Sequence, residues 1–233
     1  MLLVRGRRDR VIRWVRRGTL PVYVVPPAGH SAGHSAVPPP RPAARPRARH
    51  QASGRHLASG RGWTALVAAG PSRAMAPYRD GVAMLAAHPL RHDLRPAVGL
   101  FVDDGRAVVT CWPGRWRGGA RWVVWTPGEG PGPVPGFPLA RPTDLARAAG
   151  FARDQGAPGA IQDVLADPGG TAEEVLLDLA VLLGLPHAEL VRGTSAADLP
   201  GAELVTPKDE SVRRFDKVVS DEQRLDAEVE EGL

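Results

Sequence analysis

The sequence predicts an α+β fold in which a three-stranded antiparallel meander packs on a small set of helices. Two observations carry this prediction: a hairpin signal at Asp104-Gly105 and an almost wholly apolar helix that begins at Thr171. The apolar face of a sheet must be buried against another element, and so must a helix that is apolar on nearly all sides. The two are therefore expected to pack together.

The organisation expected along the chain has three parts. Residues 1–74 should form a disordered Arg/Pro/Ala-rich segment, residues 75–207 a compact α+β domain, and residues 208–233 an acidic helix or tail. The first part holds 14 Arg, no Lys and one acid, for a net charge of +13, whereas residues 75–233 hold 16 bases and 24 acids, for −8. A charge difference this large between parts of one chain indicates separate physical roles.

The disordered segment is expected because residues 26–62 have almost no large apolar side chains. Such a stretch cannot bury enough surface to offset the entropy of ordering. Two interpretations stay open. GC-rich DNA read in frame upstream of Met75 would produce this composition, so the segment can be an over-long gene start. Alternatively it is a polyanion-binding arm that uses Arg41, Arg45, Arg47 and Arg49.

The first 17 residues allow one further interpretation, an amphipathic basic helix at a membrane surface. Val11, Ile12 and Val15 would then lie on one side and arginines on the other. An export signal is not favoured, because Pro21 interrupts an apolar run of only six residues.

The hairpin around Asp104-Gly105 has a register that follows from a two-residue loop. Its expected pairs are Asp103 with Arg106, Val102 with Ala107, Leu100 with Val109, and Val98 with Cys111. The six apolar members of the last three pairs then share one face, which agrees with a half-buried sheet. This places Cys111 inward as a small buried hydrophobic residue rather than a nucleophile.

A third strand over residues 121–126 completes the meander, and the loop before it is rich in Trp and Arg. Trp122 and Trp125 point to opposite faces of such a strand, and we expect both to pack in the core. Arg115, Trp116 and Arg117 in the loop are the candidate partner-binding residues, because Trp and Arg are enriched at the energetic centres of protein interfaces. A stacking platform for single-stranded nucleic acid is the alternative.

The helices are expected after this sheet. The stretch at residues 127–138 is rich in Pro and Gly and predicts a linker or lid rather than a phosphate loop, because its prolines lack N–H donors. Helices are predicted over residues 143–154 and 160–166. Thr171 and Glu174 then form a capping box that opens the most apolar helix of the chain, through residue 185.

The residues that follow this helix resemble a helix-turn-helix motif. Ala180, Gly184, Leu185 and Leu190 match its small, turn and core positions. The resemblance covers about twenty residues of the stretch 171–193 and departs from the motif where bases would be read, because the second helix offers few polar side chains. It implies DNA recognition only as an alternative, and a generic helix pair explains the pattern equally well.

The last 26 residues hold nine acids and five bases. A thin apolar stripe runs through them, formed by Val212, Phe215, Val219, Leu225 and Val229. This pattern is typical of a terminal helix that either packs lightly on the core or docks on a partner.

Together these patterns favour a non-catalytic binding or regulatory protein that engages a protein partner. The excess of Arg over Lys suggests a GC-rich, actinomycete-like bacterium, and the single Cys and the lack of a membrane span suggest a cytoplasmic, soluble chain. No cofactor or metal site is expected, since His88 and His92 are separated by Pro89 and share no helix face. The alternatives are a nucleic-acid-binding protein that uses the basic arm or the motif at 171–193, and an enzyme of unrecognised class.

Overall fold

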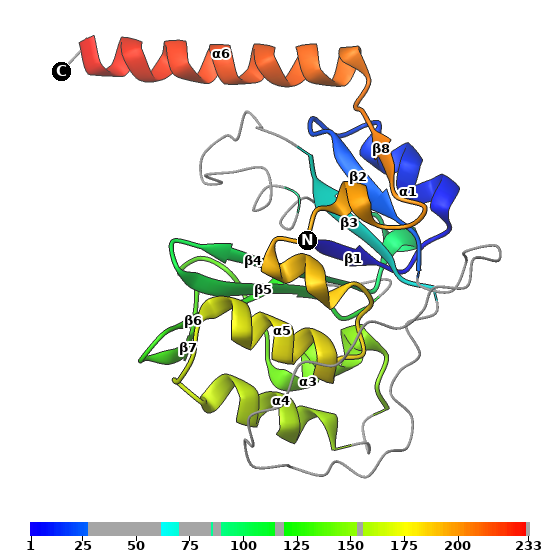
Figure 1. The fold of residues 1–233 in the computed structure, drawn as a ribbon. Coiled ribbons are helices and arrows are strands. Elements are labelled where there is room, and N and C mark those ends of the chain that lie inside the picture. Colours follow the sequence, from blue (N-terminus) through cyan, green and yellow to red (C-terminus); the bar gives the residue numbers. More distant parts are fainter. Residues whose placement is uncertain (28–61, 70–84, 86–89, 115–118, 153–155, 232–233) are drawn as a thin grey trace.

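The computed structural model describes residues 1–27, 62–69, 85, 90–114, 119–152 and 156–231. Its centre is one eight-stranded antiparallel sheet with the strand order β7-β6-β5-β4-β1-β3-β2-β8 (Figure 1). The strands are β1 (Leu2–Val4), β2 (Val22–Val25), β3 (Thr64–Ala68), β4 (Ala97–Asp103), β5 (Arg106–Trp112), β6 (Arg121–Thr126), β7 (Gly130–Gly132) and β8 (Glu203–Val205). The predicted three-stranded meander is therefore wrong as a fold class, because β4, β5 and β6 form only part of a larger sheet.

Strand β1 joins the two halves of the sheet. Leu3 pairs with Ala65 of β3 on one side and with Val98 of β4 on the other. Leu2 and Leu3 point to opposite faces and are both fully buried. A strand covered on both faces has an apolar run instead of an alternating pattern, which is why residues 2–4 show no strand periodicity.

The expectation that residues 1–74 form no packed element is wrong for residues 1–25 and 62–69. These residues contribute three strands, and their buried side chains include Leu3, Val24 and Trp63. The physical reason is that the three strands are themselves short, mainly apolar runs, which the many arginines around them concealed in the composition. Residues 28–61, on which the prediction of disorder chiefly rested, lie outside the described residues.

The predicted hairpin is confirmed in its register. The structure pairs Asp103 with Arg106, Leu100 with Val109 and Val98 with Cys111. Asp104 and Gly105 both have positive φ, at 50° and 70°, as a two-residue hairpin turn requires. Strand β7 adds a further partner to β6 and lies inside the stretch that was predicted to be a linker.

Helices cover both faces of the sheet (Figure 1). One face carries α3 (Pro142–Ala149), α4 (Ala157–Ala166) and α5 (Ala172–Leu182), and the core there includes Leu100, Val109, Ile161 and Leu176. The other face carries α1 (Arg8–Val15) and the 3₁₀ turn η1 (His92–Leu94), which pack with Leu2 and Val4 of β1. The molecule is thus a layered structure with the sheet in the middle.

All three predicted helices of this region have other bounds than expected: α3 ends at residue 149 instead of 154, α4 begins at 157 instead of 160, and α5 ends at 182 instead of 185. Helix α3 ends at Ala149, because Gly150 adopts a left-handed conformation at φ 92°. Helix α5 begins as predicted, with Thr171 accepting a hydrogen bond from the amide of Glu174 at 3.3 Å.

The second helix of the motif at 171–193 is a 3₁₀ turn, η2 (Ala188–Arg192), followed by η3 (Ala196–Asp198). Five residues in 3₁₀ conformation do not form a recognition helix of the usual kind.

The chain ends in α6 (Asp209–Glu231), which projects away from the rest of the molecule (Figure 1). The backbone amide of Lys208 donates to the carbonyl of Arg16, which ties the base of α6 to the end of α1. Among the described residues, no helix is long and apolar enough to cross a membrane.

Candidate binding surfaces

The predicted partner-binding loop cannot be placed. Arg115, Trp116 and Arg117 lie outside the described residues, and so do Arg41, Arg45, Arg47 and Arg49 of the predicted basic arm. The tryptophans beside the loop are described, and they are buried: Trp112, Trp122 and Trp125 are at most 7% exposed. The prediction that Trp122 and Trp125 pack in the core is confirmed.

A basic cleft lies between α1 and η1. We use this name for a cavity of about 310 Å³ whose walls are Arg10, Arg13, Trp14, Arg17, Arg91, His92 and Asp93. Arg10, Arg13 and Arg17 are spaced three and four residues apart, so they follow one side of α1. Four arginines and one aspartate leave this cleft strongly positive.

The sheet holds α1 in the orientation that exposes these arginines. Val11, Trp14 and Val15 are buried against β1 and β2, and the arginines face away from this contact. The amphipathic helix suggested for residues 1–17 therefore exists in shortened form, but its apolar side covers the sheet. That side is not available to a membrane surface, which corrects this interpretation of the first 17 residues.

Asp93 links the two walls of the basic cleft. Its Oδ2 lies 3.5 Å from Arg10 Nη1 on α1, and its Oδ1 lies 3.4 Å from Arg91 Nε beside η1. The Asp93 side chain is only 15% exposed, so these contacts are shielded from solvent on one side. The aspartate thereby positions one arginine on each wall.

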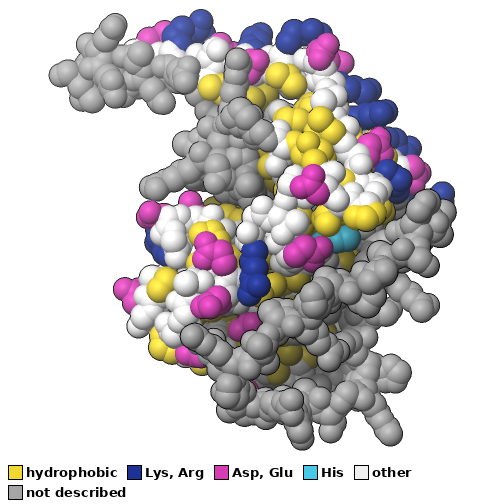
Figure 2. All heavy atoms as spheres, in the orientation of Figure 1, with side chains coloured by type: hydrophobic (Ala, Val, Ile, Leu, Met, Phe, Trp, Pro, Cys, Tyr) yellow, Lys and Arg dark blue, Asp and Glu magenta, His cyan; other side chains and the backbone are white. Residues whose placement is uncertain are grey.

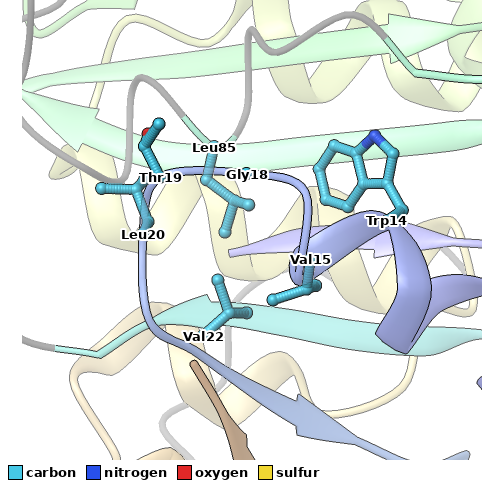
Figure 3. Close-up of a pocket in the computed structure, with 7 residues that line it drawn as sticks. All are labelled: Trp14, Val15, Gly18, Thr19, Leu20, Val22 and Leu85. Carbon is cyan, nitrogen blue, oxygen red and sulfur yellow. The ribbon is translucent and has the colours of Figure 1, made fainter. Parts of the chain in front are cut away.

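An apolar pocket adjoins the basic cleft, and Trp14 lines both (Figure 3). Its other walls come from the turn after α1 and from β2, with Val15, Leu20, Val22 and Leu85 around it. Its volume is about 30 Å³, which is close to the space of a single water molecule. This pocket is too small for a ligand of ordinary size, which needs several hundred Å³.

A third surface is the apolar side of α6. Val212, Phe215 and Val219 are partly buried, and Val218 is 47% exposed. Figure 2 shows hydrophobic side chains gathered below the first turns of α6 and over the neighbouring end of the sheet. Leu204 of the edge strand β8 is 50% exposed. The apolar side of α6 and Leu204 are candidates for protein contact.

Arg5 and Asp144, two charged groups on the inner side of the molecule, have structural explanations. Arg5 donates from Nη2 to the carbonyl of Ala149 at 2.7 Å, at the end of α3, and its guanidinium lies 4.6 Å from the ring of Trp63. Arg121 pairs with Asp144 at 3.0 Å, and Asp144 also accepts from the amide of Arg141 at 3.1 Å to cap α3.

Cys111 is fully buried, as predicted. Burial, and secondarily the charge of Asp144, raise the pKa of its thiol far above the ordinary value, while Arg121 acts in the opposite direction. This thiol is therefore not a thiolate at neutral pH. Within the described ranges, no three His, Cys, Asp or Glu side chains gather closely enough to hold a metal ion.

The chain matches no family model, no curated protein and no solved structure.

Sequence reasoning missed the basic cleft. The signal was present in α1, where Arg10, Arg13 and Arg17 follow helical spacing around the buried Trp14. Arg91 and Asp93, however, are about eighty residues away in sequence. Only the pairing of β1 with β4 brings the two segments together.

Proposed function

We propose that this protein is a non-catalytic binding or regulatory protein that engages a protein partner through α6. The observation that supports this most directly is the projection of a 23-residue helix whose apolar side is only partly covered over residues 212–219. A helix of this length costs entropy to order and gains most of its stability from packing against something else. A partner that covers the apolar side would supply that packing.

The arrangement of side chains on α6 supports helix-in-groove binding. At 100° per residue, the four apolar residues of its first half fall within an arc of about 120° around Phe215. They are Val212, Phe215, Val218 and Val219. Arg213, Lys217 and Ser220 fall on the opposite side, and all three are exposed. An amphipathic helix with this division presents its apolar side to a hydrophobic groove.

The charge of α6 indicates what kind of groove it is. Residues 221–231 hold six acids and one base, whereas residues 209–220 hold three of each. A complementary partner therefore has an apolar groove whose far end is lined by Lys or Arg. Such a partner would be attracted to the distal half of α6 and would bind less tightly as salt is added.

The loop residues Arg115, Trp116 and Arg117 remain a predicted second contact, supported by composition alone. Nucleic-acid binding is the second candidate function. It is favoured by the basic cleft, whose ligand is considered separately below.

The test begins with a photo-reactive residue placed at Val218 in cells of the native host, to trap and identify the partner. The identified protein is then purified, and its affinity is measured for the full chain and two variants. Phe215→Asp places a charge on the apolar side of α6. Ser220→Asp places the same charge on the opposite side and is the matched control.

We expect Phe215→Asp to weaken binding at least tenfold, because burying an aromatic side chain contributes about 1.5–3 kcal/mol. Ser220→Asp should bind like the unchanged protein. Equal affinities of the two variants, or a complex unaffected by truncation after Thr206, would contradict the proposal. A crosslink only to a second copy of the chain would show that α6 mediates self-association and does not bind another protein.

A further inference from the structure

The basic cleft concentrates positive charge on one small area of the fold. Four guanidinium groups and one carboxylate line it, for a net charge of +3 when His92 is left out of the count. Like charges held this close repel one another, and an anion in the cleft would remove that cost. We propose that the basic cleft binds phosphate groups, carried either by a small phosphate compound or by the backbone of a nucleic acid.

The ion pairs in the cleft leave charge available for such a ligand. Asp93 neutralises part of the charge of Arg10 and Arg91. Among the described residues, Arg13 forms an ion pair only with Asp9, at 3.5 Å. Both side chains are more than half exposed, so solvent screens this pair strongly. Arg17 has no ion pair with any residue that the structure describes. Arg13 and Arg17 are therefore the residues that offer most to an anion.

The position of these arginines is set before any ligand binds. Trp14 and Val15 fix α1 on the sheet, and Asp93 ties Arg10 to the opposite wall at Arg91. A site whose charged groups are already oriented loses less entropy on binding than one that must assemble.

Phosphate fits this cleft better than a single carboxylate. Each guanidinium presents a planar fork of N–H donors that matches two phosphate oxygens. The volume of about 310 Å³ leaves room for more than one anionic group. The adjoining apolar pocket, at about 30 Å³, leaves little room for a large apolar part of the ligand. The ligand is therefore recognised mainly by charge.

The experiment uses the full chain and two probes, pyrophosphate and a short single-stranded DNA of mixed sequence. Binding of each is measured by calorimetry at low and at moderate salt. The cleft variant is Arg13→Ala with Arg17→Ala. The matched control is Arg213→Ala with Arg214→Ala, which removes the same charge from the exposed surface of α6. A third variant, Arg45→Ala with Arg47→Ala and Arg49→Ala, removes charge from the predicted arm.

We expect the unchanged protein to bind at least one probe and the cleft variant to bind it at least tenfold more weakly, with the α6 control unaffected. Pyrophosphate binding identifies a small phosphate ligand, and binding of DNA alone identifies a nucleic-acid backbone. The proposal is overturned if neither probe binds, if the cleft variant binds like the unchanged protein, or if only the arm variant loses affinity. Circular dichroism checks that all variants keep the fold.

Discussion

The two halves of the sheet are built from different kinds of contact. Strands β4 to β7 follow one another along the chain, and each pairs with the next. On the other side, β1, β3, β2 and β8 bring together residues from both ends of the chain. The first half can form from local turns. The second half must first close long loops, and this costs conformational entropy before its contacts stabilise the fold. The halves therefore differ in how they fold and in how visible they are in the sequence.

The largest expected effect comes from removing residues 1–74. This deletion takes away β1, β2, β3 and α1, and with them buried residues such as Leu3 and Trp63. The loss exceeds the net stability of an ordinary domain, about 5–15 kcal/mol, so we expect a chain starting at Met75 not to fold cooperatively. Thermal unfolding followed by circular dichroism measures this. A cooperative transition near that of the full chain would show that the two halves are independent.

Single substitutions in each half sharpen the comparison. Leu100→Ala in β4 and Leu3→Ala in β1 each remove a fully buried leucine side chain, so each should lower the free energy of unfolding by about 2–5 kcal/mol. Their kinetics should differ. We expect Leu100→Ala to slow folding, because the hairpin forms early, and Leu3→Ala mainly to speed unfolding. Stopped-flow folding in denaturant measures both rates, and equal effects on folding would refute the distinction.

A smaller effect is expected at Arg5, which connects β1 to the end of α3. Arg5→Ala removes the hydrogen bond to Ala149 and the contact with Trp63, which should cost about 2 kcal/mol. Arg7→Ala is the control, because the Arg7 side chain is 79% exposed and pairs only with Asp9 in the part of the chain that the structure describes. Denaturant unfolding compares the two variants. Equal midpoints would mean that Arg5 does not hold the layers together.

The smallest expected effect is on how the free energy of unfolding depends on pH, and it arises in the half of the sheet formed by β4 to β7. Because the pKa of Cys111 is raised in the folded state by burial and by Asp144, only the unfolded chain releases this proton as pH rises. Stability is therefore lost above the ordinary thiol pKa of about 8.5, at about 1.4 kcal/mol per pH unit. The Cys111→Ala variant has no thiol at this position and therefore does not lose stability in this way. The difference in unfolding free energy between the two proteins should fall between pH 8 and 10, and a constant difference would contradict the assignment.

The same contrast explains what the sequence could predict. The register of the hairpin followed from Asp104-Gly105, because the turn and the apolar alternation agree. The start of α5 followed from Thr171 and Glu174, because a capping box is also local. The three residues of β1 carry no such signal: a buried central strand has no alternation, and its partners lie far away in the chain.

Composition was misleading in the N-terminal third. A basic, Pro-rich stretch separates β2 from β3, and it hid the apolar segments on either side. The basic cleft was missed for a related reason. Its two walls are defined by a strand pairing that no short-range pattern reveals, whereas the stripe on α6 could be read from helical spacing alone.

Strand β1 is the short strand at which the two halves of the sheet meet. It contributes three residue pairs to each neighbour, whereas β4 and β5 share seven. Each row of paired residues resists separation of the strands, and the rows at β1, where the two halves meet, are less than half as long as the row between β4 and β5. We therefore expect the amides of β1 to open to solvent before those of β5.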